Sequence, residues 1–471
     1  MPTHDGQGKA DATVVTPSGG PEPAAVVPAF ARRDQPAILE SVAGDTKHGR
    51  WSIFACDPVE VVTVSPASSD NPFSVLDARL ACYPGVQNHA GLPFVGGWIG
   101  HISYEAGARL ENVLPTNPAG TALPVVRLAM YDHAAIFDHR AAQWHLVAIE
   151  WPHRCGIERP AAEDRLASLV RLLRTAQDPA KVVQPGVVSA SSPVPDWSKE
   201  DYLARVRRAK EYISAGDVYQ VNLTQRFSVR TDVSPIELYL ALRQTNPADY
   251  AAFLAWEDQA ILSSSPELFL ELRNGCVITR PIKGTRPRTG DAQLDAVRRQ
   301  ELAHSEKDRA ELNMIIDLLR NDISRVCRPG SVRVVSAGDL ETHPTVFHRV
   351  ATIRGQLNPD MGAVDLLRAT CPGGSITGAP KIRAMQIIDE LESVQRGVYC
   401  GSIGYLGLDG SMTMDIAIRT MIFDRGTVHI HAGGAIVADS DPDDEYAETL
   451  AKAEGMFRAL RSRERVSSMR P

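Results

Sequence analysis

The stretch DVYQVNLTQRF (residues 217–227) decides the fold class, because apolar and polar side chains alternate along it. Tyr219, Val221, Leu223 and Phe227 fall on one face, and polar side chains fall on the other. A two-residue period is typical of a strand in an antiparallel sheet, where one face packs on the core. The stretch therefore predicts a long strand whose polar face lies in solvent or lines a wet cleft.

Strands and helices mix along the rest of the chain without the regular spacing of βαβ units. Further alternating segments lie at residues 267–272, 399–406, 414–423 and 428–437. Helical patterns lie at residues 165–176, 199–216, 306–319 and 381–391, and after Asp444. The glycine-rich stretch VGGWIGHISYEAG (residues 95–107) predicts a strand that a neighbouring backbone approaches closely, and then a bend. This mixture favours an α+β fold with large antiparallel sheets.

Composition limits the class of protein. The 471 residues include 57 acidic and 50 basic side chains, and 44% of them are hydrophobic, which is ordinary globular usage. The net charge of −7 argues against a nucleic-acid-binding protein. No apolar run of about 18 residues could span a membrane, and no signal peptide is visible. The seven scattered cysteines contain no CxxC pair, so we expect reduced thiols in the cytoplasm and no zinc site.

Changes in composition divide the chain into five parts. Residues 1–27 predict a disordered arm rich in Pro, Gly and Ala. Residues 28–176 form an N-terminal region, and residues 177–196 form a Pro- and Ser-rich linker. Residues 197–461 carry the motifs described below, and we expect them to form the catalytic region. Residues 462–471 form a tail.

A lysine and a glutamate are candidates for catalysis. PIKGTRPR (residues 281–288) holds Lys283 between prolines and a glycine, after an apolar strand at residues 276–279. Burial beside apolar strands lowers the pKa of a lysine and makes its amine a nucleophile. Glu267 lies sixteen residues upstream, and a hairpin would bring the two together as a base and an acid. The alternative is a surface lysine in a loop, which is the commoner place for a lysine.

Two helices carry carboxylates that could meet. Glu311 borders the apolar stripe of its helix, where a carboxylate needs a partner. Glu448 follows Glu445 by three residues and precedes Lys452 by four. Glu311 and Glu448 on facing helices could hold magnesium, which takes one or two protein carboxylates and leaves positions for an anionic substrate. The alternatives are ion pairs along each helix, of Glu311 with Lys307 and of Glu448 with Lys452.

Two further motifs suit an anionic ligand. CPGGSITGAPKIRAM (residues 371–385) places a glycine-rich loop before a helix. This pattern predicts either an anion-binding site at the helix N-terminus or an ordinary loop that leads into a helix. In DIAIRT, Arg419 shares a face of the predicted strand with Asp415, so its partner is either this aspartate or a substrate carboxylate. Gly433 and Gly434 would let a ligand touch the backbone. Together the motifs specify a small carboxylate-bearing substrate, one magnesium ion, one amine and one carboxylic acid.

Five motifs, in order, resemble the chorismate-utilising family: PIKGTRPR, KDRAELNMIIDLLRNDISRV, PGGSITGAPKIRAM, YCGSIGYLGLDGSMTMDIAIRT and EYAETLAKA. The family includes the large subunits of anthranilate synthase and aminodeoxychorismate synthase, and the isochorismate and salicylate synthases. The resemblance is dense over residues 197–458 and looser over residues 28–150. It implies large antiparallel sheets packed face to face, with helices outside.

Two positions separate the members of this family. Gln220 stands where water-using members carry a lysine that activates water, so the resemblance implies ammonia as the nucleophile. Lys283 lies in PIKGT, the form found in aminodeoxychorismate synthases, whereas anthranilate synthases read PIAGT. The resemblance therefore favours 4-amino-4-deoxychorismate, a precursor of 4-aminobenzoate and folate, as the product. The alternative product is anthranilate, formed with loss of pyruvate.

The resemblance also implies a mechanism and a set of site residues. Lys283 would attack C2 of chorismate while Glu267 protonates the leaving C4 hydroxyl, and ammonia would then add at C4 and expel the lysine. Magnesium, held by Glu311 and Glu448, would bind the ring carboxylate of chorismate. The implied substrate-binding positions are Gln220, His348, Ser375, Tyr399, Arg419, Gly433, Gly434 and Lys452. An implied tryptophan pocket would use Ser41, His48, Gly49, Arg50, Trp51, Asp249, Tyr250 and Ala251.

The tryptophan pocket departs from the family pattern at one position. Asp249 stands where the family usually has proline, and its charge argues against binding of an indole. The alternative is that Ser41 and Trp51 are core and turn residues.

The chain lacks the Cys-His pattern of a glutaminase, so we expect a separate glutamine amidotransferase subunit to supply the ammonia. A different class of protein, an inactive subunit that only docks the glutaminase, would have lost chemical groups. Glu267, Lys283, Glu311 and Glu448 are all retained, which argues against it.

Overall fold

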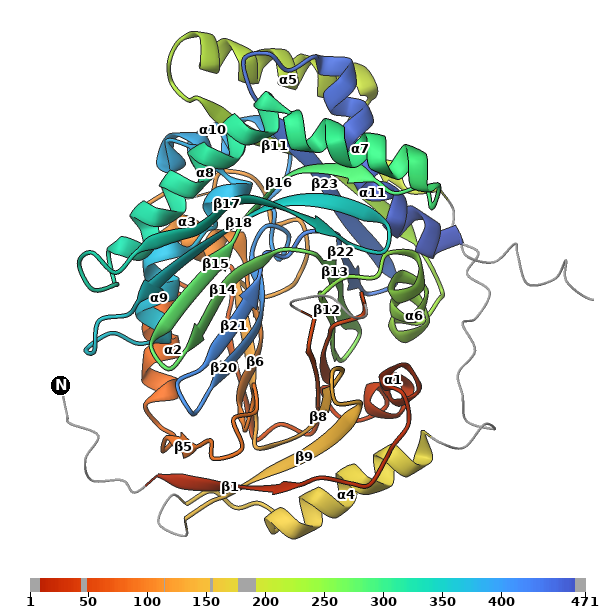
Figure 1. The fold of residues 1–471 in the computed structure, drawn as a ribbon, viewed down its shortest axis with the longest axis vertical. Helices are drawn as coiled ribbons and strands as arrows, with labels where there is room; N and C mark the ends of the chain where they lie inside the picture. The colour runs from red at the N-terminus through yellow and green to blue at the C-terminus, as the bar shows by residue number, and fades with distance from the viewer. Residues whose placement is uncertain (1–8, 44–48, 114, 153–155, 177–191, 462–471) are drawn as a thin grey trace, which may run out of the picture.

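Two large, mainly antiparallel sheets of 13 and 10 strands make up the centre of the protein (Figure 1). The computed structural model describes residues 9–43, 49–113, 115–152, 156–176 and 192–461. The first sheet runs in the order β10 (Val194–Pro195), β11 (Gln220–Arg230), β23 (Thr427–Ile436), β22 (Thr420–Asp424), β13 (Gln259–Ser265), β12 (Tyr250–Trp256), β2 (Ala37–Glu40), β3 (Trp51–Ala55), β8 (His133–Asp138), β9 (Gln143–Glu150), β1 (Ala10–Val15) and β5 (Val86–Gln87), and β19 (Gly378–Ala379) pairs with β11. The second sheet runs in the order β16 (Ile282–Pro287), β18 (Val346–Gln356), β15 (Cys276–Arg280), β14 (Leu268–Arg273), β21 (Met412–Asp415), β20 (Ser402–Gly407), β6 (Gly97–Ile102), β7 (Val126–Tyr131) and β4 (Glu60–Val64), and β17 (Arg333–Thr342) pairs with β18.

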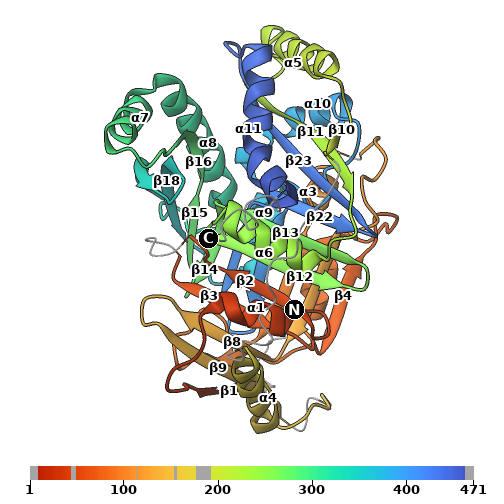
Figure 2. The ribbon, with the colours of Figure 1, turned by 90° about the vertical axis from the view of Figure 1, so that its right-hand side faces the viewer.

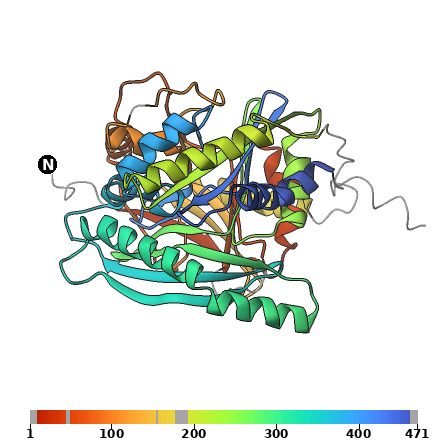
Figure 3. The same cartoon turned by 90° about the horizontal axis from the view of Figure 1, so that it is seen from above.

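Helices lie outside the paired sheets. Figures 1 and 2 show α5, α7, α8, α10 and α11 gathered at one end of the molecule, with α1 and α4 at the other end, and Figure 3 shows the first group from above. None of the described helices is long and apolar enough to cross a membrane. The helices are α1 (Pro23–Ala31), α2 (Pro72–Leu80), α3 (Tyr104–Leu110), α4 (Ala162–Thr175), α5 (Lys199–Ser214), α6 (Pro235–Thr245), α7 (Ala292–His304), α8 (Glu306–Ser324), α9 (Ala363–Thr370), the 3₁₀ turn η3 (Gly374–Ile376), α10 (Lys381–Leu391) and α11 (Pro442–Arg461).

The two sheets face each other across the main hydrophobic core. Ile53 and Ile261 from the first sheet lie in one buried cluster with Trp98 and Leu270 from the second sheet. A second cluster fills the space between the first sheet and helices α1, α4, α6 and α11. The predicted α+β fold with large antiparallel sheets is confirmed.

Strands from both halves of the sequence are hydrogen-bonded within each sheet. β12 pairs with β2 in the first sheet, and β20 pairs with β6 in the second. The N-terminal region (28–176) and the catalytic region (197–461) therefore share both sheets and one core. In the predicted linker, β10 pairs with β11. Residues 177–191 of that linker and the predicted tail (462–471) lie outside the described residues.

The prediction of a disordered arm over residues 1–27 is wrong for its described part. β1 pairs with β9 from Asp11 opposite Glu150 to Val15 opposite Leu146, and α1 begins at Pro23. The strand has few large apolar residues, so its order comes from pairing with β9 rather than from local propensity. Residues 1–8 lie outside the described residues.

The strand that decided the fold class is present, but its polar face is not in solvent. β11 pairs along ten residues with β23, from Val221 opposite Ile436 to Arg230 opposite Thr427. The polar side chains of Asn222 and Thr224 are nevertheless buried. They belong to a hydrogen-bonded layer behind the candidate site, described below.

Residues 414–423, predicted as one strand, form two strands in different sheets. β21 ends at Asp415 in the second sheet, and β22 begins at Thr420 in the first. The chain crosses between the sheets at residues 416–419, where Arg419 has a φ of +51°. Because the alternation of side chains continues across this crossing, periodicity could not detect it. Arg419 therefore does not share a strand face with Asp415.

The glycine-rich stretch at residues 95–107 forms β6, as predicted, and α3 follows it in place of a bend. An added Cβ at Gly97 would lie 2.3 Å from the carbonyl oxygen of Leu406, and one at Gly100 would lie 2.0 Å from that of Arg127. The glycines therefore allow close approach of both neighbouring strands, β20 and β7.

Candidate active site

An irregularity in strand β16 sets the direction of the Lys283 side chain. The register between β16 and β18 shifts between Ile282 and Thr285, and Gly284 has a φ of +83°. An added Cβ at Gly284 would lie 2.8 Å from Cγ of Asp308, so both the conformation and the space require glycine. A β-bulge re-aims the side chains beside it. Lys283 therefore lies in a bulged strand.

The amine of Lys283 has no hydrogen bond and no ion pair within 4 Å among the described residues, and the residue is largely buried. Burial lowers the pKa of this amine. The charge of Lys452 lowers it further, whereas Glu311, Glu267 and Glu448 act in the opposite direction. A lowered pKa increases the fraction of neutral amine, which is the nucleophilic form.

Glu267 lies immediately before β14, and the hairpin of β14 and β15 brings it to the same end of the sheet as Lys283. Glu267 is 5% exposed, and its Oε1 accepts a hydrogen bond of 2.7 Å from the hydroxyl of Ser375. Burial raises the pKa of Glu267 to about 7, although the Ser375 hydrogen bond and the charge of Lys283 oppose this rise. A carboxyl group with this pKa can give up and take back a proton near neutral pH. The hairpin predicted to join the two residues is confirmed.

Three carboxylates from two helices interact electrostatically beside Lys283. Glu311 lies on α8, and Glu445 and Glu448 lie on α11. Burial raises the pKa of Glu311, and the charge of Glu448 acts in the same direction. An added Cβ at Gly434 would lie 3.1 Å from Oε2 of Glu445 and 3.5 Å from Oε1 of Glu448, so β23 passes close to both side chains.

The donor atoms of this group suit a hard cation. Oε2 of Glu445 is buried without a hydrogen-bond partner among the described residues, and Glu311 forms no ion pair with Lys307 there. Glu448 forms the ion pair with Lys452 that was the alternative to metal binding, with 2.7 Å between Oε1 and Nζ, and both side chains are about half exposed. Magnesium binds carboxylate oxygens and leaves other positions for water or substrate. Glu311 and Glu448 therefore offer the ligand type of the predicted ion, and Glu445 lies three residues before Glu448, although among the described residues the oxygen atoms of the three carboxylates are not all within 4.8 Å of one another.

Three further predicted residues, Arg419, His348 and Tyr399, have different surroundings: Arg419 interacts electrostatically with Glu267, and His348 lies opposite Thr285, two residues after Lys283. Arg419 forms no ion pair with Asp415 in the described part of the chain. Burial lowers the pKa of Arg419, and the charge of Glu267 opposes this decrease. His348 is buried, and its Nδ1 lies 2.8 Å from the hydroxyl oxygen of Thr285. Burial and the charge of Arg419 hold the pKa of His348 well below its usual range, so the imidazole is neutral. Tyr399 precedes β20 and stacks on His431 at 5.2 Å between ring centroids.

The predicted residues of the first sheet lie at its edge near α11. Gln220 is fully buried; its Nε2 donates to Oδ1 of Asn222 at 3.4 Å, and its Oε1 has no partner among the described residues. Lys452 donates from Nζ to the carbonyl oxygen of Gly433 at 2.9 Å. An added Cβ at Gly433 would lie 2.1 Å from the carbonyl oxygen of Leu223. The glycine at 433 is therefore required by the neighbouring strand.

The glycine-rich loop before α10 contributes Ser375 through η3. Lys381, at the start of α10, is buried and pairs with Asp322 at 2.6 Å between Nζ and Oδ2. It also donates to the carbonyl oxygen of Thr370 at 3.1 Å. The polar contacts of Lys381 therefore lie within the protein interior. The loop contributes to the site through the Ser375 hydroxyl, from which Glu267 accepts a hydrogen bond.

The residues of the implied tryptophan pocket lie together, with their polar groups paired. The Ser41 hydroxyl lies 3.1 Å from the carbonyl oxygen of Trp51 and 3.0 Å from that of Asp249, so it bonds one or the other. Arg50 pairs with Asp138 at 2.7 Å and stacks over Trp51. These contacts favour the alternative that Ser41 and Trp51 are core and turn residues. Gly49, Tyr250 and Ala251 flank them, and His48 lies outside the described residues.

The chain is similar to proteins that act on chorismate. The profile of the chorismate binding enzyme family matches residues 38–458. Aminodeoxychorismate synthase component 1 of Klebsiella aerogenes is 40% identical over 439 residues, covering 90% of this chain and 93% of the relative. Anthranilate synthase component 1 of Pseudomonas putida is 38% identical over 459 residues, covering 92% of each chain.

The fold is similar to that of a solved relative. The crystal structure of anthranilate synthase component I from Streptococcus pneumoniae superposes with a TM-score of 0.78 at 33% identity, covering 88% of this chain and 93% of the other. The sequence relatives and this structure agree with the five motifs and with the paired sheets. The protein is therefore a member of the chorismate-binding enzyme family, and its substrate class is chorismate.

Proposed function

We propose that the protein is the large subunit of an aminodeoxychorismate synthase, which converts chorismate and ammonia to 4-amino-4-deoxychorismate and water. The observation that carries this proposal is the amine of Lys283, which belongs to a partly buried residue, forms no hydrogen bond or ion pair with the described residues and interacts electrostatically with Glu311 and Glu267. Relatives with this name are among the similar proteins, at 40% and 39% identity. Anthranilate synthase component 1 is similar at 38%, so the lysine rather than overall identity supports this member of the family.

In the proposed reaction, the neutral amine of Lys283 bonds to C2 of chorismate as the C4 hydroxyl leaves. Glu267 supplies the proton that turns this leaving group into water. Ammonia then bonds to C4, the bond between Lys283 and C2 breaks, and Glu267 takes the surplus proton of the new amine. An intermediate on the enzyme divides one difficult substitution into two easier ones. The pKa of Glu267, about 7, suits both the acid and the base role.

Two of the three carboxylates would bind the cation at the part of the site that receives the ring carboxylate of chorismate. Glu311 and Glu448 are the proposed ligands of Mg²⁺, and Glu445 lies next to them. When bound, Mg²⁺ would neutralise the ring carboxylate of chorismate. Arg419, which interacts with Glu267, and Lys452, which pairs with Glu448, provide further positive charge nearby.

The nitrogen nucleophile would come from a separate glutamine amidotransferase subunit. Gln220 cannot remove a proton from water, and its buried Oε1, which has no hydrogen-bond partner among the described residues, can accept an N–H of ammonia. Ammonium salt at high concentration should replace this subunit in the test tube.

The product identifies the member of the family. The isolated protein is given chorismate, magnesium and ammonium chloride, and the products are separated by chromatography. We expect 4-amino-4-deoxychorismate to accumulate. Anthranilate, recognised by its fluorescence, as the main product would instead identify an anthranilate synthase, and isochorismate would identify water as the nucleophile.

A further inference from the structure

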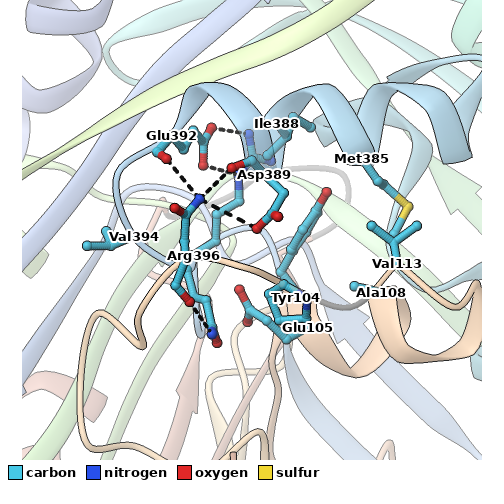
Figure 4. A pocket seen from close by; sticks show the side chains of 13 residues that line it. Tyr104, Glu105, Ala108, Val113, Met385, Ile388, Asp389, Glu392, Val394 and Arg396 are labelled. Carbon is cyan, nitrogen blue, oxygen red and sulfur yellow. Dashed lines mark hydrogen bonds and ion pairs between the residues drawn. The ribbon is translucent and has the colours of Figure 1, made fainter.

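A buried arginine lies directly behind the candidate site. Arg396 is 3% exposed, and its Nε donates to Oε2 of Glu392 at 2.9 Å. Its Nη2 approaches Oε1 of Glu392 to 2.5 Å, so the pair is held by two parallel hydrogen bonds. The guanidinium also lies 4.9 Å from the ring centre of Tyr104. Figure 4 shows this pair beside Tyr104 and Glu105, around a cavity of about 20 Å³, which has room for one water molecule but not for a chorismate ring.

The same guanidinium joins two parts of the chain that are far apart in sequence. Nη1 donates to the carbonyl oxygen of Ile376 in η3 at 2.9 Å. Nη2 donates to the carbonyl oxygen of Asn222 in β11 at 3.0 Å. Glu392 extends the link, because its Oε1 accepts hydrogen bonds from the backbone amide and the hydroxyl of Thr224. Arg396 and Glu392 thus fix η3 against β11.

Hydrogen bonds continue from these two elements to the reacting groups. Asn222 donates from Nδ2 to the carbonyl oxygen of Ser375 at 3.1 Å. The Ser375 hydroxyl then donates to Glu267 at 2.7 Å. On the other side, Gln220 donates to Oδ1 of Asn222, and its own Oε1 has no hydrogen-bond partner in the part of the chain that the structure describes. One buried ion pair therefore supports both the acid–base carboxyl group and the amide expected to meet ammonia.

We propose that Arg396 is a positioning residue, which holds Ser375 and Asn222 so that the hydrogen bond from Ser375 to Glu267 is formed before substrate binds. The proposal rests on the proposed acid–base role of Glu267 and goes beyond it, because Arg396 touches no reacting atom. An arginine suits this task because its planar group donates in several fixed directions at once, which a lysine cannot do.

The protonation of Glu267 should report on the network. The Ser375 hydrogen bond lowers the pKa of Glu267 against the effect of burial, so loss of that bond should raise it. A general acid must be protonated, so kcat/KM for chorismate falls as the pH rises through the pKa of Glu267. A higher pKa moves this alkaline limb to higher pH. The titratable and charged groups that face Glu267 are Lys283, Lys452, Arg419, Asp415 and Cys400.

The test compares the pH profiles of Arg396→Lys, Ser375→Ala and the double variant in the full chain with magnesium and ammonium chloride. Each single variant should move the alkaline limb up by about half a pH unit or more, and the double variant should move it no further than Ser375→Ala alone, because both changes remove the same hydrogen bond. Chorismate consumption is followed, so the result does not depend on which family product forms. If the wild type consumes no chorismate with ammonium, the proposed function fails instead.

Matched variants separate positioning from loss of stability. Asp322→Asn breaks the other buried ion pair of this region, with Lys381, and should lower Tm while leaving the limb in place. Glu392→Gln weakens the hold on Arg396 with little change of shape and serves if Arg396→Lys does not fold. A lower Tm with an unmoved limb in the Arg396 and Glu392 variants would overturn the proposal. An equal movement of the limb in Asp322→Asn, or additive movements in the double variant, would do the same.

Discussion

The candidate active site and the implied tryptophan pocket differ in how their charged and polar groups are paired. At the active site, the described residues provide no ion pair for Lys283 or Glu311, and one buried oxygen of Glu445 has no hydrogen-bond partner. In the N-terminal pocket, Arg50 pairs with Asp138 and Ser41 bonds the backbone.

Unpaired charge is costly to bury, so it persists where a ligand supplies the missing partner. Paired groups need no ligand, and their contacts serve the fold. The comparison thus assigns chemistry to the first region and a structural role to the second. The following predictions test that assignment, beginning with the largest effect.

Replacing Lys283 by alanine should have the largest effect on turnover. The variant loses the proposed nucleophile, so we expect kcat to fall by about 10³-fold or more while chorismate still binds with a similar dissociation constant. Rapid-quench kinetics and calorimetric titration measure the two quantities. Lys199→Ala, at an exposed surface ion pair, is the control. A rate close to that of the wild type would remove the covalent step and leave direct attack by ammonia.

Removing the proposed cation or one of its ligands should have the next largest effect. Glu311→Gln halves the charge of the proposed ligand pair, and we expect activity at limiting Mg²⁺ to fall by about 10²-fold, with partial recovery at high Mg²⁺. Dialysis against a chelator should abolish the activity of the wild type, and added Mg²⁺ should restore it. Glu306→Gln, exposed on the first turn of the same helix, is the matched control. Indifference to the chelator would exclude these glutamates as metal ligands.

Glu267 should make stability depend on pH. Its pKa of about 7 in the folded protein exceeds the value of 4.5 for an exposed glutamate. Between these values the folded state binds more protons than the unfolded state, so stability falls as the pH rises from about 4.5 to 7. Glu267→Gln keeps an acceptor for Ser375 and removes this loss, which is at most about 3 kcal/mol. Thermal unfolding at pH 5 and pH 8 should show that the variant is more stable than the wild type only at the higher pH. An equal difference in stability at both pH values would contradict a raised pKa for Glu267.

The N-terminal pocket should give the smallest effects. Arg50→Ala removes a 43% exposed arginine from the buried Asp138, which keeps hydrogen bonds from the backbone amides of Arg140 and Ala141, so we expect Tm to fall by about 5 °C or less, with kcat unchanged. L-Tryptophan at millimolar concentration should change neither Tm nor the rate. Inhibition by tryptophan that Arg50→Ala relieves would contradict the structural role and establish a regulatory site.

The sequence predicted those parts of the fold and the site that local patterns encode. The periodicity of α10 and the alternation of β11 follow directly from side-chain order, and the five motifs identified the family. The proximity of Lys283 and Glu267 followed from a hairpin between nearby strands.

Other features depend on contacts that no local pattern encodes. β1 is ordered by its pairing with β9, and the crossing between sheets before Thr420 keeps the alternation of a single strand. Glu445 and Arg396 have ordinary sequence surroundings. Their importance is visible only once α11 and β23, or η3 and β11, are placed side by side.

The pairing of β12 with β2 and of β20 with β6 also limits how the gene can be divided. A fragment that begins at residue 197 would expose β12 in the first sheet and β20 in the second as new edges, and such edges recruit other chains. Chimaeras that exchange the N-terminal third with a relative would have to preserve the register of both pairs. The register of these strand pairs therefore couples the two segments, although the chemistry is assigned to only one of them.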